Sequence, residues 1–182
     1  MTDPNQSTPW ISPTREGDHI HASCYEWVRG VVANHNLAGR STIEIGSALV
    51  NYGTIRDFFT GSYTGVDISP GEGVDRIEKC EHLSDGSNYW ANVVSLETLE
   101  HVRRPWVAVR EMARVGQHDA HILVSARGYD NRGCWQVHGY PDDYWRVSEG
   151  AMRVMAEDAG LEVIEISADP EGPGFFMHCQ KP

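Results

Sequence analysis

Two spacings of apolar residues recur along the chain and predict its secondary structure. Short apolar runs bounded by glycine, asparagine or aspartate predict strands, whereas apolar residues three and four positions apart predict helices. The expected strands are 42–46, 62–67, 74–78, 91–96, 121–126, 161–166 and 174–180. The expected helices are 19–36, 53–60, one that starts at Pro105 and one that runs from Ser148 to Ala159. Strands that alternate with helices in this way predict an α/β fold, a three-layer sandwich.

Two segments stand outside this alternation. Residues 1–17 are rich in proline, serine and threonine and have no periodic apolar pattern, so we expect a flexible N-terminal arm. Residues 18–182 are expected to form a single domain, because a chain of 182 residues can build one sizeable core. Residues 127–145 form the longest irregular stretch of that domain and are rich in aromatic residues. A loop of this length in a compact domain usually has a function, and its aromatic content argues against disorder.

Charge and cysteine usage narrow the functional class. The formal net charge of −11 argues against a duplex nucleic acid or an acidic membrane surface as the partner. Between His101 and Met155 eight arginines outnumber six acidic residues, which suits either an anionic substrate or a solvated helix surface. The four cysteines form no C-x-x-C pair, which argues against a zinc ribbon or a disulfide framework. No apolar run approaches the ~20 residues of a membrane span, so we expect a cytoplasmic protein.

Residues 41–67 predict the first βαβ unit of a nucleotide-binding sheet. A dinucleotide-binding loop has the pattern G-x-G-x-x-G, because its second glycine lets the backbone approach a pyrophosphate. Here Ala48 and Asn51 occupy the second and third glycine positions. Glu44, at the end of the first strand, would repel a diphosphate and tolerate a cation, and Asp67 can accept hydrogen bonds from two ribose hydroxyls. S-adenosylmethionine, a nucleoside with a positive charge and no phosphate, fits these observations.

Four segments, in their order and spacing, resemble the class I S-adenosylmethionine-dependent methyltransferases, in particular the type 11-like members. The segments are Glu44–Ser47, Gly65–Asp67, Val93–Val102 and His138–Arg146. Together the resemblance covers roughly residues 40–180. It implies a Rossmann-like, seven-stranded, mostly parallel sheet with an antiparallel last strand. It also implies that the protein is an enzyme that transfers a methyl group from S-adenosylmethionine.

The resemblance further implies which residues bind the cofactor. Glu44 would face the methionine end, Asp67 would hold the ribose and Ile68 would pack on the adenine. The full implied set is Glu44, Gly46, Ser47, Ala48, Gly53, Asp67, Ile68, Cys80, Glu81, Ser95 and Leu96. The first loop departs from the family pattern E-x-G-x-G-x-G, since Ala48 and Val50 replace two glycines. Cys80 and Glu81 lie in the loop after the third strand, and the alternative for them is an ordinary polar loop that binds no ligand.

The acceptor side of the site is expected in the aromatic loop. Methyl transfer from a sulfonium is an in-line displacement, so alignment is the main requirement and a base is needed only when the acceptor loses a proton. His138 is the candidate base because its ordinary pKa lies near neutrality. Tyr140 and Asp143 are further catalytic candidates, and Tyr144 and Arg146 are candidate positioning groups. The alternatives are a structural role for His138 and a turn-capping role for Asp143.

An E-x-x-E-H pattern leaves metal binding open. The pattern is formed by Glu97, Glu100 and His101. In some relatives that methylate phenolic oxygens it is associated with a divalent cation, and carboxylates suit magnesium. In others the histidine locks the turn after the fourth strand. A second group, His19, His21 and Cys24, matches no standard zinc spacing.

The leading hypothesis from the sequence is a methyltransferase that acts on a small-molecule acceptor. A small acceptor is favoured because the chain shows no added recognition domain. The alternatives are a non-catalytic module that binds S-adenosylmethionine and a nicotinamide-dependent oxidoreductase. Glu44 and the missing glycines count against the oxidoreductase. The sequence also allows a homodimer, and it identifies neither the acceptor nor the atom that is methylated.

Overall fold

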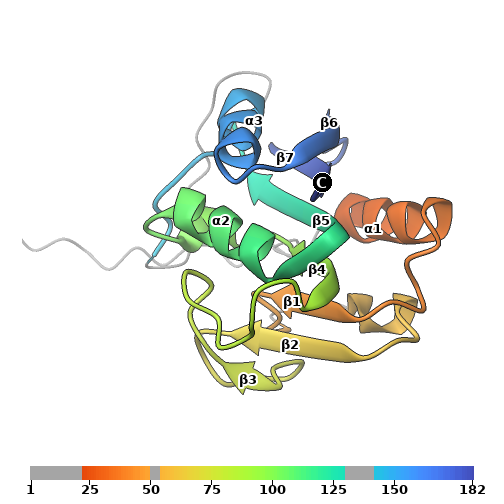
Figure 1. Ribbon diagram of the computed structural model, residues 1–182. Coiled ribbons are helices and arrows are strands. Elements are labelled where there is room, and N and C mark those ends of the chain that lie inside the picture. The colour runs from red at the N-terminus through yellow and green to blue at the C-terminus, as the bar shows by residue number, and fades with distance from the viewer. Residues whose placement is uncertain (1–21, 50–53, 130–141) are drawn as a thin grey trace, which may run out of the picture.

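The computed structural model describes residues 22–49, 54–129 and 142–182 of the chain (Figure 1). The helices are α1 (Ala22–Asn34), α2 (Pro105–Val115) and α3 (Glu149–Asp158), and the 3-10 turns are η1 (Ile55–Phe58) and η2 (Leu99–His101). The strands are β1 (Thr42–Ile45), β2 (Tyr63–Asp67), β3 (Arg76–Ile77), β4 (Trp90–Ser95), β5 (Gly116–Arg127), β6 (Glu162–Ala168) and β7 (Gly174–Gln180). None of the described helices is long and apolar enough to cross a membrane.

The seven strands form one mixed sheet in the order β3-β2-β1-β4-β5-β7-β6. The first five strands in this order run parallel, and β7 lies antiparallel to both β5 and β6. This arrangement confirms the predicted mostly parallel sheet with an antiparallel last strand. Because parallel strands end at the same edge, the arrowheads of β1, β2 and β5 lie on one side of the molecule (Figure 1). In open α/β sheets ligands bind at that carboxyl edge.

Helices cover both faces of the sheet and produce two separate cores. Along each buried strand successive side chains point to opposite faces. Val94 and Leu123 pack with α1 and η1 on one face. Their neighbours Val93 and Val124 pack with α2 and α3 on the other face. The predicted three-layer sandwich is therefore confirmed.

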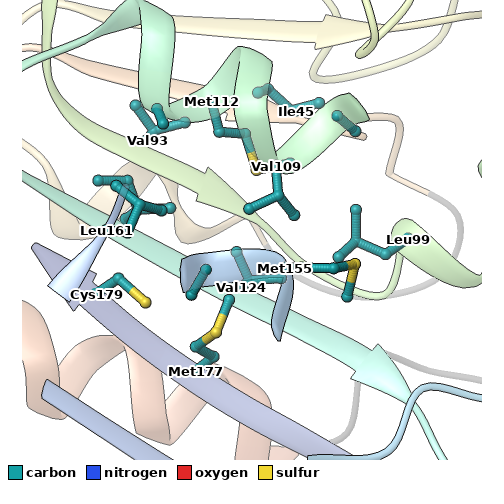
Figure 2. Close-up of a cluster of buried hydrophobic side chains, with 14 of the residues drawn as sticks. Ile45, Val93, Leu99, Val109, Met112, Val124, Met155, Leu161, Met177 and Cys179 are labelled. Atoms are coloured by element: carbon teal, nitrogen blue, oxygen red, sulfur yellow. The ribbon is translucent and has the colours of Figure 1, made fainter. Parts of the chain in front are cut away.

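The larger core lies between the sheet and the helices α2 and α3 (Figure 2). The α2 residues Val109 and Met112 point toward the sheet, where Val93 and Val124 meet them. Both α2 residues are fully buried, as their three-residue spacing on an amphipathic helix predicts. Burial of such side chains contributes about 1.5–3 kcal/mol each, so this core holds both helices firmly on the sheet.

Two helix boundaries follow the predicted capping signals. Pro105 occupies the first turn of α2, where its missing N–H costs no hydrogen bond. Ser148 caps α3, and its hydroxyl accepts a hydrogen bond from the Ala151 N–H at 3.2 Å. Gly160 follows α3 with a φ of 73°, which suits glycine. These local signals place the start of α2 and the whole of α3 where the sequence predicts them.

Three elements differ from their predicted extents. β5 begins at Gly116, before the strand expected at 121–126, and within this extension Asp119 has a φ of 61° and the register with β4 shifts. β3 is only two residues long, and just before it the Asp75 carboxylate accepts the Gly65 N–H at 2.7 Å. The helix expected at 53–60 is the single turn η1, capped by the Thr54 hydroxyl. α1 is described from Ala22, so the first residues of the helix expected at 19–36 lie outside the described part.

Candidate functional site at the carboxyl edge

The loop after β1 begins with a glycine that no other residue could replace easily. Gly46 has a φ of 82°, and a Cβ atom at this position would lie 2.0 Å from the Thr98 hydroxyl oxygen. The Gly46 N–H donates to the Val66 carbonyl at 2.8 Å, and the Ser47 N–H donates to the same oxygen at 3.1 Å. This glycine therefore lets the β1 loop pass close to the segment that follows β4. Gly53, also predicted for this loop, lies outside the described residues.

The Ser47 side chain is buried, so it is not open to a ligand. Its hydroxyl has no hydrogen-bond partner in the described part of the chain. A Cβ atom on Gly65 would lie 2.7 Å from the Ser47 hydroxyl, and one on Gly73 would lie 2.6 Å from its carbonyl oxygen. Two glycines thus make room for the β1 loop against β2 and the turn before β3.

Asp67 ends β2 beside this loop, as predicted. One carboxylate oxygen accepts the Ala48 N–H at 3.3 Å, and the other accepts the Ser69 N–H at 2.9 Å. Each carboxylate oxygen has a further lone pair, so the group can still accept hydrogen bonds from a ligand. The next residue, Ile68, is 66% exposed. The end of β2 therefore offers an acidic group and an open apolar side chain next to each other.

Glu44 is buried below the loop on the α1 face of the sheet. Its carboxylate accepts the Tyr63 hydroxyl at 2.7 Å. The guanidinium group of Arg56 lies over the Tyr63 ring at 4.8 Å and pairs with Asp75. Burial raises the pKa of Glu44 to about 7, although Tyr63 and Arg56 act in the opposite direction. A cation near this carboxyl group would favour its charged form.

Ser95 and Leu96, predicted beside the donor methyl, are both covered. Ser95 at the end of β4 is fully buried, and its hydroxyl has no hydrogen-bond partner among the described residues. Leu96 packs in the core on the α1 face. Thr98 then folds back, and its hydroxyl donates to the Leu96 carbonyl at 2.9 Å. The side chains of Ser95 and Leu96 therefore face the protein interior.

The loop after β3 contributes two half-buried polar side chains. Burial, followed by the charge of Glu81, raises the pKa of Cys80 to about 12, so the thiol stays protonated near neutral pH. Glu81 accepts a hydrogen bond from the Arg104 guanidinium at 3.0 Å. This ion pair joins the loop after β3 to the start of α2.

The E-x-x-E-H residues do not gather into one ligand set. Glu97 has a φ of 49°, accepts the Ser125 hydroxyl at 2.9 Å and lies 2.5 Å from the Arg127 guanidinium. Glu100 is fully buried, and burial together with the charge of Glu97 raises its pKa. His101 turns its Nδ1 atom to the Asp142 carbonyl at 3.2 Å. Within 22–49, 54–129 and 142–182, no three histidine, cysteine or acidic residues are arranged to hold a metal ion.

The described end of the aromatic loop is fixed by backbone and ionic contacts. Asp143 and Arg146 form a bidentate ion pair at 2.5 and 2.6 Å, and each side chain is only 3% exposed. The Tyr144 hydroxyl donates to the Asp142 carboxylate at 2.7 Å. Asp143 and Arg146 thus stabilise this segment, and a catalytic role for Asp143 stays a prediction. His138 and Tyr140 lie outside the described residues.

Sequence reasoning missed three residues that shape the site. Tyr63 donates to Glu44, Thr98 covers Gly46 and Arg127 pairs with Glu97. A signal existed only for Tyr63, because alternate residues of neighbouring strands share a face of the sheet. The contacts of Thr98 and Arg127 bring together segments that are distant in the sequence, and no local pattern predicts them.

The electrostatics of this edge disfavour a diphosphate. Phosphate sites use the free N–H groups at the start of a helix. Between β1 and β2 the described residues contain only the single turn η1. Asp67 adds a negative charge beside the same loop, and Glu44 adds a second one when it ionises near pH 7. The edge therefore suits a ligand that has hydroxyl groups and a positive charge.

The chain matches no protein-family model and no curated protein. Among solved structures it is similar to 1,6-didemethyltoxoflavin-N1-methyltransferase of Burkholderia thailandensis, with 13% identity and a TM-score of 0.68 over 86% of this chain and 77% of that one. It is also similar to magnesium protoporphyrin IX methyltransferase of Synechocystis, with 14% identity and a TM-score of 0.65 over 90% of this chain and 80% of that one. The chain has the class I methyltransferase fold. At such identities the likeness establishes the fold alone.

The class I methyltransferase fold also carries other chemistry. The chain resembles the cyclase SpnF with 14% identity and a TM-score of 0.64 over 86% of this chain and 80% of that one. Activity therefore has to be argued from the residues of the site.

Proposed function

We propose that the protein binds S-adenosylmethionine at the carboxyl ends of β1, β2 and β4 and transfers its methyl group to a small-molecule acceptor. The observation that carries this proposal is the Asp67 carboxylate at the end of β2, beside the Gly46 loop and the exposed side chain of Ile68. Glu44 adds a buried acid in β1, below the same loop. The three side chains suit the ribose, the adenine and the cationic end of this cofactor.

The structural neighbours support the same ligand. The Burkholderia enzyme was crystallised with S-adenosylhomocysteine and its acceptor, and the Synechocystis enzyme was crystallised with S-adenosylmethionine. Both act on small molecules according to their names. We carry the ligand and the small-molecule acceptor over to this chain as part of the proposal. We also propose a cytoplasmic setting, which suits four cysteines without a C-x-x-C pair.

The proposed residue roles follow from the position of each side chain. Asp67 accepts hydrogen bonds from the ribose hydroxyls, and Ile68 packs against the adenine. Cys80 and Glu81, in the loop after β3, border the adenine. The backbone of Gly46, Ser47 and Ala48 lies alongside the cofactor, and Glu44 stabilises the positively charged end of the cofactor. Backbone atoms of Ser95 and Leu96 border the transferred group, since their side chains are buried.

The proposed chemistry makes modest demands on the protein. When bound, S-adenosylmethionine supplies a methyl group on a positively charged sulfur. The chain then has to hold an acceptor in line with that group and exclude water, which is catalysis by orientation. His138 is proposed as the base that takes a proton from the acceptor where the chemistry requires it. Tyr140 and Asp143 are proposed as neighbours of the acceptor in the same segment.

A second candidate is a module that binds the cofactor without transferring methyl. Ser95 is fully buried, and the Thr98 side chain packs on Gly46, so the strand ends are closely covered. The likeness to a cyclase is compatible with chemistry other than methyl transfer on this fold. Cofactor binding without turnover on any acceptor would favour this candidate.

Calorimetry with S-adenosylmethionine, S-adenosylhomocysteine and a nicotinamide dinucleotide tests the proposal. We expect the first two to bind in the low-micromolar range, roughly −8 kcal/mol, and the dinucleotide to give no heat. Release of S-adenosylhomocysteine with a panel of acceptors then tests transfer. Clear binding of the dinucleotide alone would contradict the assignment.

A further inference from the structure

Three large aromatic side chains are exposed together where α2 begins. Trp106 is 39% exposed, Trp145 is 40% exposed and Tyr144 is 36% exposed. The Trp106 and Trp145 rings meet edge to face, with centroids 6.0 Å apart. Trp106 lies in the first turn of α2, and the other two lie in the segment that leads from β5 to α3, so they share the carboxyl edge of the sheet (Figure 1). Grouped exposed aromatics mark a binding surface.

These rings are held in place before any ligand arrives. The Trp145 indole N–H donates to the Val102 carbonyl at 2.9 Å. The backbone N–H groups of Tyr144 and Trp145 both donate to the Glu100 carbonyl, at 2.8 and 3.2 Å. A side chain that is already fixed loses little conformational entropy when it binds a ligand. The surface is therefore preorganised by contacts with η2.

An arginine that forms no ion pair with any described acidic residue borders the rings. The Arg103 guanidinium lies over the Tyr144 ring at 5.6 Å, and its Nε atom donates to the Tyr144 hydroxyl at 3.3 Å. No acidic side chain of the described residues forms an ion pair with Arg103, whereas its neighbour Arg104 pairs with Glu81 at 3.0 Å. The carboxylates of Asp142 and Glu81 lie near enough to act on Arg103 electrostatically, but Asp142 accepts the Tyr144 hydroxyl and Glu81 pairs with Arg104. The terminal N–H groups of Arg103 are thus available to an anion.

We propose that Arg103, Trp106, Tyr144 and Trp145 form the acceptor site and that the acceptor is a planar aromatic compound with a carboxylate group. The rings of the protein offer flat faces and edges to an aromatic ring, and a guanidinium binds a carboxylate through paired N–H groups. The chain carries a net charge of −11, so an anion gains attraction only beside a local cation such as Arg103. This inference rests on the proposed function, because the Arg104–Glu81 pair joins the surface to the loop proposed to border the adenine.

Calorimetry on the full chain tests the acceptor class with three probes. β-Naphthoate is planar and anionic, β-naphthamide is planar and neutral, and cyclohexanecarboxylate is anionic and not planar. We expect β-naphthoate to bind at least about tenfold more tightly than either control, with S-adenosylhomocysteine present. Arg103→Gln should remove the preference for naphthoate over naphthamide. Trp106→Leu should weaken both aromatic probes and leave the preference unchanged.

Arg110→Gln is the matched control variant. Arg110 is exposed, as Arg103 is, but it lies on α2 and pairs with Asp158. It should bind all three probes as the wild type does. Equal affinity for naphthoate and naphthamide, no binding of naphthoate, or an unchanged preference in Arg103→Gln would each overturn the proposal. S-adenosylhomocysteine binding is measured separately in every variant. Its absence in the wild type would refute the cofactor assignment, while the naphthoate comparison would still decide the acceptor class.

Discussion

Glu44→Gln separates the charge of the buried acid from its shape, because the glutamine oxygen can still accept the Tyr63 hydroxyl. Burial raises the pKa of Glu44 from its ordinary value of 4.5 to about 7. One pKa unit corresponds to ~1.4 kcal/mol, so this shift is worth about 3 kcal/mol. The folded protein holds the proton more tightly than the unfolded chain does. The contribution of the group to stability is therefore full below pH 4.5 and is lost as the pH rises through 7.

Urea unfolding followed by tryptophan fluorescence measures this effect as a difference between wild type and variant. At pH 4.5 the free energies of unfolding should be similar, and above pH 7 the variant should be more stable by up to about 3 kcal/mol. Glu26→Gln is the control, because Glu26 is exposed on α1 and pairs with Arg29 of the same helix. A difference between wild type and Glu44→Gln that stays constant with pH would refute the reasoning.

The same variant tests the proposed role of Glu44 at the positive end of the cofactor. S-adenosylmethionine carries the sulfonium charge and S-adenosylhomocysteine does not. Above pH 7, Glu44→Gln should therefore weaken binding of the first compound by roughly tenfold, or ~1.4 kcal/mol, and affect the second compound less. Equal losses in calorimetry would place Glu44 away from the charged end.

Three further substitutions have defined outcomes. Asp67→Ala should weaken cofactor binding by roughly 1.5–3 kcal/mol in calorimetry, with little change in stability, and a variant that binds normally would exclude the ribose role. Gly46→Ala should lower the free energy of unfolding by roughly 1–3 kcal/mol, and Thr98→Ala in that background should restore part of it if the clash is the cause. The rings of His121 and His178 are hydrogen-bonded to each other at 2.8 Å, and burial lowers both pKa values to about 4. The free energy of unfolding should therefore be highest above pH 6.5 and fall as the pH drops toward 4. His178→Gln should flatten that fall in urea unfolding, and an unchanged pH profile would contradict it.

The positions of most strands along the chain could be predicted because their signals are local, whereas the antiparallel last strand was implied by the family resemblance. Apolar runs such as 91–96 and 121–126 need no knowledge of the partner strand to be recognised as buried strands. Parallel strands end at one edge, so Asp67 could be placed beside the β1 loop from the sequence alone. The start of β5 could not be predicted, because residues 116–119 have the composition of a turn and Asp119 adopts a left-handed conformation inside the strand. These residues form a strand because they pair with β4, and such long-range pairing is not visible in the local composition.

The site was less predictable than the fold because its contacts are long-range. The pairing of Glu44 with Tyr63 depends on the register of β1 and β2. The burial of Ser95 depends on its position in the middle of the sheet, where it pairs with Ile45 of β1 and Val124 of β5. Asp143 looked like a free acid in a polar run, yet a buried arginine three residues later neutralises it. Sequence patterns give the types of residue at the edge, and packing decides which of them face a ligand.

The sheet separates two apolar clusters of the described residues. Val28 of α1 belongs to the cluster on one face, and Met112 of α2 belongs to the cluster on the other face. Substitutions that are distant and share no partners usually have additive effects on stability. A change of side chain in one cluster is therefore expected to need no matching change in the other. The helical layer on one face could be redesigned while the opposite layer keeps the strand ends, and thus the proposed site, in position.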